Sequence, residues 1–216
     1  KPTTCESDAD ASTYWFPTLF EYTRPIEPLS GIVYYVKRTW ADVTALPPGM
    51  KIVAGNAKAM KSDAWPMRPE RILADLREVL PRDAILCTDV GWNKNGVGQQ
   101  FPIYTPGSIL TPGGYATMGF GAPAAIGAKM ACPDKVVLAL VGDGGFGQNP
   151  AMLATAVEQD VAVIWLIMNN NAYGTIAGLE AAHYGTTFAT VFEKNGKTWS
   201  PDFAAIARAY GIDGVK

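Results

Sequence analysis

Residues 136–174 constrain the fold of this chain most, because two apolar runs there each end in a short polar turn. The first run, residues 136–141, leads into Gly-Asp-Gly-Gly at 142–145, and the second, residues 161–168, leads into Asn-Asn-Asn at 169–171. A helix-like stretch separates the two runs. The pattern predicts two buried parallel strands joined by a right-handed crossover helix, which is the repeating unit of an α/β fold.

The two polar turns are expected to meet at one rim of the sheet. Asp143 and Asn170 are 27 positions apart, but neighbouring parallel strands have their carboxyl ends side by side, where open α/β sheets bind ligands. Asn149 as N-cap and Pro150 at the first helical position predict that the crossover helix begins there, with its positive end near the Gly-rich turn. One carboxylate with amide and carbonyl oxygens suits Mg²⁺ when phosphate oxygens complete the octahedron. The residues thus indicate a metal–diphosphate site, against the plain alternative of an ordinary Asp-Gly turn.

This spacing resembles the thiamine-diphosphate fingerprint of the 2-oxoacid decarboxylase and carboligase family, which includes acetolactate synthase and benzoylformate decarboxylase. The resemblance implies a three-layer, Rossmann-like α/β fold, with a mostly parallel sheet and helices on both faces. It implies thiamine diphosphate and Mg²⁺ as cofactors, with Asp143, Asn170 and the main-chain carbonyl of Ala172 as metal ligands. It also implies decarboxylation or carboligation of a 2-oxoacid through an ylid at C2 of the cofactor.

Two further segments resemble the same family. The Thr-Asp-Val-Gly turn at 88–91 matches a turn that contacts the diphosphate, although Trp92 and Asn93 replace the family's Gln-His pair; Trp92 is either a core residue or a pocket residue. Residues 113–123 resemble the segment whose methionine, here Met118, bends the cofactor into a V shape. The backbone of Ala116, in place of a family glycine, and of Met118 would hold the aminopyrimidine ring. A lone Met is more often core filler, and only its place in this segment favours the cofactor role.

The cofactor-binding residues implied by the resemblance are Gly91, Trp92, Asn93, Ala116, Met118, Asp143, Gly144, Gly145, Asn170, Ala172, Tyr173 and Gly174. No catalytic residue is assigned within the chain, because the family's activating glutamate comes from a separate aminopyrimidine-binding domain. His183 is the only histidine. It is either an acid–base group or a surface residue at a helix end.

The resemblance covers residues 62–216, which are expected to form the diphosphate-binding domain, truncated at its C-terminal end. Residues 1–61 are left as a linker or an N-terminal arm, with short strands predicted at 32–36 and 51–54. Pro69 is expected to open a helix, residues 186–199 to form a mobile loop, and Ser200 to cap a helix that runs through Tyr210.

Composition narrows the partners of the chain. A net charge of −2 over 216 residues gives no reason to expect nucleic acid, and no apolar stretch approaches a membrane span. Three cysteines without a CxxC pair indicate reduced thiols and a cytoplasmic protein. Apolar surface near Met118, Phe120 and Tyr173 predicts a homo- or hetero-oligomer completed by an aminopyrimidine-binding domain or subunit, with a small 2-oxoacid as substrate.

Two other functions stay open at this point. One is a non-catalytic binding or scaffolding chain that retains the cofactor fold. The other is the β subunit of an oxoacid:ferredoxin oxidoreductase, which usually carries cysteines for an iron–sulfur cluster; no such spacing is present in this sequence.

Overall fold

The computed structural model describes residues 57–216, so the strands predicted at 32–36 and 51–54 lie outside the described residues. The chain divides into two compact units. The described parts of the first are residues 57–83 and 96–108, and the second comprises residues 84–95 and 109–216. The boundary expected at residue 62 stays a prediction.

The first unit contains the helices α2 (Ala57–Met60) and α3 (Pro69–Val79) and the end of α4 (Trp92–Gln100). Pro69 opens α3 as predicted. The guanidinium group of Arg77 donates hydrogen bonds to the carbonyls of Leu80 and Pro81, both at 2.7 Å, and lies 4.9 Å from the ring centre of Phe101. This one side chain therefore fixes the end of α3 against the segment that follows α4.

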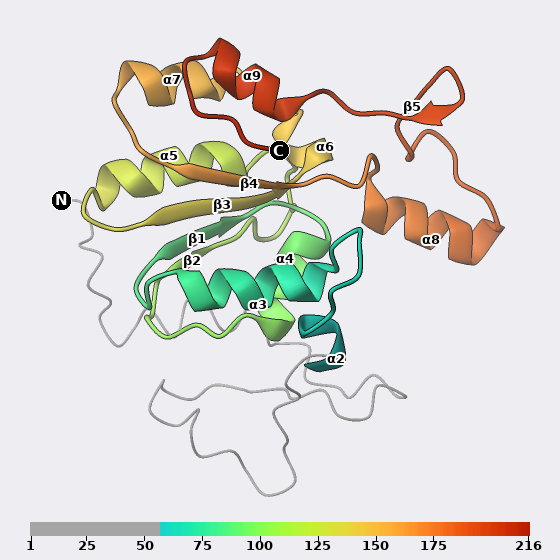
Figure 1. Ribbon diagram of the computed structural model, residues 1–216, viewed down its shortest axis with the longest axis horizontal. Helices are drawn as coiled ribbons and strands as arrows, with labels where there is room; N and C mark the ends of the chain where they lie inside the picture. Colours follow the sequence, from blue (N-terminus) through green and yellow to red (C-terminus); the bar gives the residue numbers. More distant parts are fainter. Residues whose placement is uncertain (1–56) are drawn as a thin grey trace, which may run out of the picture. The chain divides into compact units, whose positions relative to one another are not determined.

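The second unit is built on four parallel strands in the order β2–β1–β3–β4 (Figure 1). Their bounds are β1 Ile85–Thr88, β2 Ile109–Leu110, β3 Val137–Gly142 and β4 Ile164–Met168. Neighbouring residues of a strand face opposite sides of the sheet, and in β1 both Leu86 and Cys87 are buried, as are both Leu140 and Val141 in β3. Burial of both faces explains why these strands are continuous apolar runs in the sequence. The predicted α/β fold with a mostly parallel sheet is confirmed.

Three helices cover one face of this sheet (Figure 1): α5 (Gly121–Ala131), α7 (Met152–Glu158) and α9 (Phe203–Ala209). Small residues let α5 pack closely; a Cβ at Gly121 would lie 2.8 Å from the backbone carbonyl of Thr88. The remaining elements are α6 (Asp143–Phe146), α8 (Gly174–Tyr184), and the antiparallel hairpin of β5 (Glu193–Lys194) and β6 (Lys197–Thr198).

Two predicted helix starts are wrong by two residues each. The helix α7 begins at Met152 with Ala151 as N-cap, because the turns that follow α6 continue to Asn149, whose N–H donates to the carbonyl of Phe146. The helix α9 begins at Phe203, and its cap is Asp202, whose carboxylate accepts from the N–H of Ala205 at 2.9 Å.

The segment expected to be a mobile loop, residues 186–199, instead has defined contacts. Its β5–β6 hairpin is closed by the N–H of Trp199, which donates to the carbonyl of Phe192 at 2.8 Å. Two more backbone bonds join residues 190 and 192 to the polar turn after β4. The loop was predicted because the partner of residues 190–192, the turn at 171–173, lies about twenty residues earlier and the sequence does not reveal this pairing.

Cys87 is a free, fully buried cysteine, as expected for a reduced thiol, whereas Cys132 is disulfide-bonded, so the expectation was wrong there. No helix between residues 57 and 216 is long and apolar enough to cross a membrane.

The buried Cys87 thiol is expected to react only when the protein unfolds. Burial raises the pKa of this thiol to about 12, so at pH 8 only about one molecule in ten thousand carries the reactive thiolate there. At pH values between the ordinary thiol pKa and about 12, Cys87 is deprotonated in the unfolded chain but still protonated in the folded chain. The free energy of unfolding therefore falls as pH rises through this range. Peptide mass spectrometry after iodoacetamide treatment should find Cys87 unlabelled in buffer and labelled in denaturant; rapid labelling of the folded protein would contradict this.

Candidate functional site

The polar turns after β3 and β4 lie side by side at the carboxyl edge of the sheet. Gly142, the last residue of β3, pairs with Met168, the last residue of β4. Asp143 directly follows Gly142, and Asn170 lies two residues after Met168, so the structure places both residues at one rim of the sheet, as their spacing predicts.

The Asp143 carboxyl is buried but incompletely bonded. Its residue is 2% exposed, and atom Oδ2 has no hydrogen-bond partner. Burial raises the pKa of Asp143, while the backbone N–H groups of Gly144, Ala172 and Asn171 oppose that rise. An acceptor oxygen kept away from water and left without a donor is costly unless a cation or a proton occupies it.

Glycines at this rim leave no space for a side chain. A Cβ at Gly174 would collide with the amide nitrogen of Asn170. A Cβ at Gly144 would lie 2.7 Å from the ring of Tyr173 and 3.3 Å from the Cε of Met118. Met118, which the resemblance placed against the cofactor, therefore does reach the Gly-Asp-Gly-Gly turn.

Asp89 connects three Gly-rich segments: its own turn at 88–91, the segment at 113–123 and the turn at 142–145. It was not predicted from the sequence as a site residue. It is 0% exposed. Its carboxylate accepts from the N–H groups of Gly119 at 3.1 Å and Gly121 at 2.7 Å, and Oδ1 lies 2.6 Å from the position of a Cβ on Gly145. The signal was present, since Asp89 directly follows a buried strand just as Asp143 does.

The other predicted residues are placed more loosely. Gly91 has φ +116° and faces the hydroxyl of Thr175, with its Cβ position 3.7 Å away. Trp92 and Asn93 open α4, and the buried Asn93 amide accepts from the N–H of Lys94 at 2.6 Å. Ala116 has φ +47°, a conformation in which glycine is the easier residue.

His183 does not contact the residues of this rim. It is exposed on α8, and its Nδ1 lies 2.9 Å from the carbonyl oxygen of Leu179 one turn earlier. The ring therefore occupies the position expected of a surface histidine near a helix C-terminus, where Gly185 ends α8 in the left-handed conformation.

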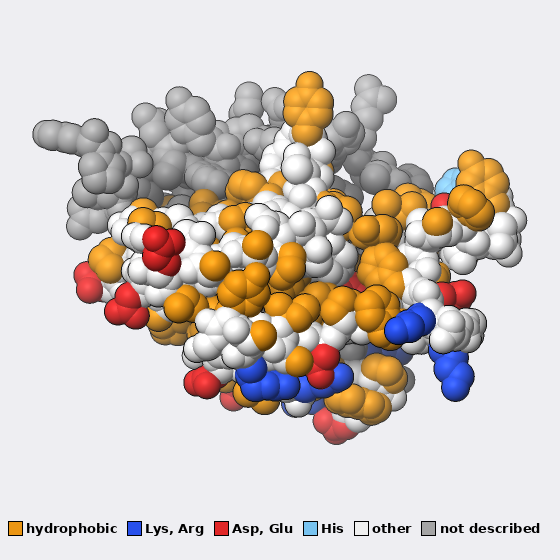
Figure 2. Space-filling model, turned by 90° about the horizontal axis from the view of Figure 1, so that it is seen from above, with side chains coloured by type: hydrophobic (Ala, Val, Ile, Leu, Met, Phe, Trp, Pro, Cys, Tyr) orange, Lys and Arg blue, Asp and Glu red, His pale blue; other side chains and the backbone are white. Residues whose placement is uncertain are grey.

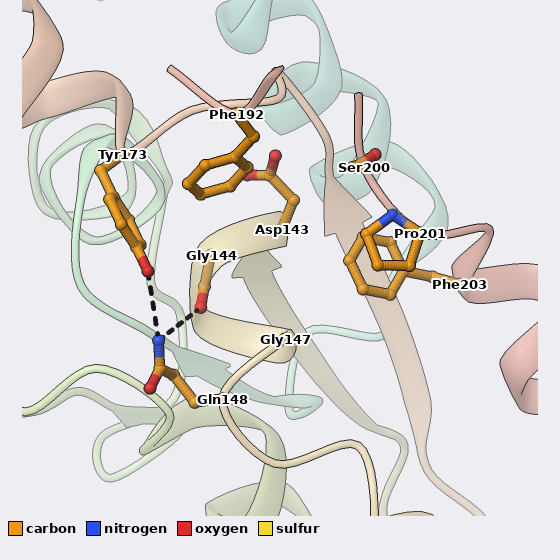
Figure 3. Close-up of a pocket in the computed structure, with 9 residues that line it drawn as sticks. All are labelled: Asp143, Gly144, Gly147, Gln148, Tyr173, Phe192, Ser200, Pro201 and Phe203. Carbon is orange, nitrogen blue, oxygen red and sulfur yellow. Dashed lines mark hydrogen bonds between the residues drawn. The ribbon is translucent and has the colours of Figure 1, made fainter. Parts of the chain in front are cut away.

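A cavity of about 210 Å³ opens at Asp143 (Figure 3). On one side the rings of Tyr173 and Phe192 pack edge to face with centres 4.8 Å apart, and Figure 3 shows Pro201 and Phe203 on the other side. The Gln148 amide donates to the carbonyl of Gly144 at 3.3 Å. The lining is Asp143, Gly144, Gly147, Gln148, Tyr173, Phe192, Ser200, Pro201 and Phe203.

The donor set fits a hard divalent cation whose coordination is completed by a ligand. Asp143 supplies one carboxylate with a free oxygen and Asn170 an exposed amide, and the N–H groups of Asn171 and Ala172 bring the following turn against that carboxylate. Within residues 57–216 no three His, Cys, Asp or Glu side chains cluster as a metal cage. Oxygen ligands from one carboxylate, with the rest supplied by phosphate and water, are what Mg²⁺ accepts.

Most of the described chain resembles known proteins. Residues 89–216 match a family model described as "Thiamine pyrophosphate enzyme, C-terminal TPP binding domain", and residues 1–103 match a model described as a domain of unknown function, DUF1996. The probable acetolactate synthase large subunit of Methanocaldococcus jannaschii is 39% identical over 159 residues, which are 71% of this chain and 26% of the relative.

Two other relatives carry different names. The acetolactate synthase large subunit of Lactococcus lactis is 37% identical over 69% of this chain and 25% of its own length. The sulfoacetaldehyde acetyltransferase of Castellaniella defragrans is 29% identical over 69% of this chain and 24% of its own length. The chain thus spans about a quarter of the length of the curated relatives it matches.

Proposed function

Because the chain belongs to the family of thiamine pyrophosphate enzymes, through the C-terminal TPP-binding domain that covers residues 89–216, we propose that it is the diphosphate- and Mg²⁺-binding half of an enzyme that acts on 2-oxoacids. The reaction is decarboxylation, carboligation or both. The cofactor is thiamine diphosphate, and another domain or subunit completes the site.

The Asp143 carboxylate is the observation that carries this proposal. It is buried at the sheet rim with one unbonded oxygen, and the turn that bears Asn170 and Ala172 lies against it. A cation at this position would satisfy the oxygen and offset the cost of burying the charge. Asp143, Asn170 and the Ala172 carbonyl are the proposed ligands.

The remaining residues orient and shield the cofactor. When bound, thiamine diphosphate supplies the carbanion and the electron sink that cleavage beside a keto group requires. Backbone groups at Gly144 and Gly145 would hold the diphosphate; neither residue has room for a side chain, because the Tyr173 ring and the Asp89 carboxylate lie where a Cβ would be. The rings of Tyr173 and Phe192 exclude water beside Asp143, which strengthens the electrostatic interactions of the site.

Met118→Ala is expected to weaken binding of thiamine diphosphate by more than it lowers stability. The Met118 side chain is half-buried and reaches the Gly144 turn, so its truncation removes a support for the cofactor more than a core contact. Calorimetric titration of the cofactor and thermal unfolding, done on the same variant, separate the two effects. A loss of stability alone, of the roughly 2–5 kcal/mol typical of a core Met→Ala change, would return Met118 to a packing role.

We propose that the chain is an obligate oligomer. Large apolar side chains of the second unit are exposed, among them Phe120 at 38%, Leu179 at 56% and Tyr184 at 79%. Apolar side chains also cover much of the face seen in Figure 2, while basic side chains gather along one edge. Light scattering on the purified chain should find a dimer or larger species; a well-behaved monomer would contradict this.

A non-catalytic chain that keeps the fold is the competing function. Isothermal titration of thiamine diphosphate with Mg²⁺, with and without an aminopyrimidine-binding partner chain, tests the two. The catalytic half should bind in a Mg²⁺-dependent way, more tightly with the partner, and turn over a 2-oxoacid only with it. Absence of Mg²⁺-dependent binding in both arms would overturn the proposed function.

A further inference from the structure

A short segment, residues 188–192, crosses the turn that carries the proposed metal ligands; it is called the strap here. The N–H of Tyr173 donates to the carbonyl of Thr190, and the N–H of Phe192 donates to the carbonyl of Asn171, both at 2.8 Å. Ala172 and Val191 form an antiparallel bridge between these bonds. The strap thus pairs with the metal-ligand turn through a single antiparallel bridge.

This pairing leaves the backbone groups of Ala172 free of the strap. In an antiparallel pair, successive residues direct their N–H and C=O groups alternately toward and away from the partner. Asn171 and Tyr173 use theirs toward the strap, so those of Ala172 are directed to the opposite side. The N–H of Ala172 does interact with the Asp143 carboxylate, and its carbonyl belongs to the same side of the chain.

The strap is itself held by one carboxylate of α8. Glu180 Oε2 accepts from the hydroxyl of Thr190 at 2.6 Å and from the N–H of Phe188 at 3.0 Å. Thr190 is 7% exposed, so its hydroxyl has little access to water as an alternative partner. Hydrogen bonds thus link Glu180 to the strap and the strap to the ligand turn, and the chain itself links that turn to Glu180 because α8 begins at Gly174 directly after it.

We propose that Glu180 is a positioning residue for the metal site, acting through Thr190 and the strap to hold the Ala172 carbonyl beside Asp143. It rests on the proposed function, since the metal is the proposed Mg²⁺. Glu180 would contact neither the metal nor the cofactor. Its effect is on the position of the Ala172 carbonyl, which is a main-chain group and therefore moves with the backbone of the turn.

Three variants of the full chain test this. Glu180→Ala removes the acceptor, Glu180→Gln keeps an acceptor oxygen without the charge, and Glu193→Ala removes an exposed carboxylate from the adjoining hairpin as a control for net charge. Amide hydrogen exchange is measured without cofactor at Tyr173 and Phe192, with Leu140 of β3 as the internal reference. Binding of Mn²⁺, as a spectroscopic substitute for Mg²⁺, is measured by electron paramagnetic resonance in the presence of thiamine diphosphate.

Glu180→Ala should accelerate exchange at Tyr173 and Phe192 but not at Leu140, and should weaken Mn²⁺ binding about 10- to 100-fold, the usual cost of losing a partner behind a metal ligand. Glu180→Gln should largely restore both, and Glu193→Ala should change neither. Unchanged exchange, or faster exchange with unchanged Mn²⁺ affinity, would overturn the positioning role. The parent chain is measured first. If it binds no Mn²⁺ in the presence of thiamine diphosphate, the proposed function is wrong, and this failure is distinct from a failure of the positioning role.

Discussion

Asp143→Ala should abolish Mg²⁺-dependent binding of thiamine diphosphate while leaving the fold intact. Loss of a group behind a ligand already costs about 10- to 100-fold in metal affinity, so loss of the one carboxylate ligand should cost at least the upper end of that range. The fold should survive with some loss of stability, because the variant removes the acceptor of the N–H groups of Gly144, Asn171 and Ala172 but also removes the buried, unbonded Oδ2. Calorimetry with saturating Mg²⁺, beside circular dichroism of both proteins, measures the two effects; equal affinity of variant and parent would show that Asp143 is not a ligand.

The same residue gives a pH dependence of known sign. Burial raises the pKa of Asp143, so the metal-free folded chain keeps this proton to a higher pH than the unfolded chain does. The free energy of unfolding therefore falls as pH rises from the ordinary carboxyl range through the raised pKa. Asp143→Asn does not titrate and should lack this part of the slope, and Mg²⁺ with the cofactor should remove it from the parent protein. Identical slopes for the parent and Asp143→Asn without metal would contradict the burial account.

Asp89→Ala should destabilise the second unit by about 3 kcal/mol or more. The variant leaves the N–H groups of Gly119 and Gly121 without their acceptor, and each buried unsatisfied donor costs about 1–3 kcal/mol. It also opens space beside Gly145, where the carboxylate now lies. Gly119 and Gly121 lie one and three residues after Met118, the proposed support of the cofactor, so the affinity for the cofactor should fall as well.

Chemical denaturation measures the stability change, with Asp134→Ala as the control because Asp134 is an exposed carboxylate whose removal should change stability by no more than about 0.5 kcal/mol. Asp89→Asn keeps one acceptor oxygen and should fall between the parent and Asp89→Ala. Equal stability of Asp89→Ala and Asp134→Ala would mean that the carboxylate does not hold the three Gly-rich segments together.

The sheet and the central pair of the site were predictable because they follow from short-range sequence rules. Two apolar runs with a crossover of the right length place Asp143 beside Asn170 through the alignment of parallel strands alone, and the Gly142–Met168 pairing confirms it. The reach of Met118 to Gly144 was expected only through the family resemblance, since nothing in the composition of its segment specifies a contact across 26 residues.

Contacts between distant segments account for what the sequence did not reveal. Ser200 looked like a helix cap, but its hydroxyl accepts from the Asn169 amide at 2.6 Å, and Asp202 caps α9 instead. The strap was predicted to be part of a mobile loop because its partners, Glu180 and the turn at 171–173, lie elsewhere in the chain. Asp89 likewise reads as a turn residue until the two glycines that donate to it are placed in space.

Anomalous diffraction from crystals grown with thiamine diphosphate and Mn²⁺ tests the central proposal most directly, because it locates the metal without reference to activity. We expect a single strong peak at coordination distance, about 2.1 Å for the Mg²⁺ that Mn²⁺ replaces, from the Asp143 carboxylate, the Asn170 side-chain oxygen and the Ala172 carbonyl, with diphosphate oxygens completing the shell. Thiamine diphosphate bound with no peak at Asp143, or a peak held by other residues, would contradict it.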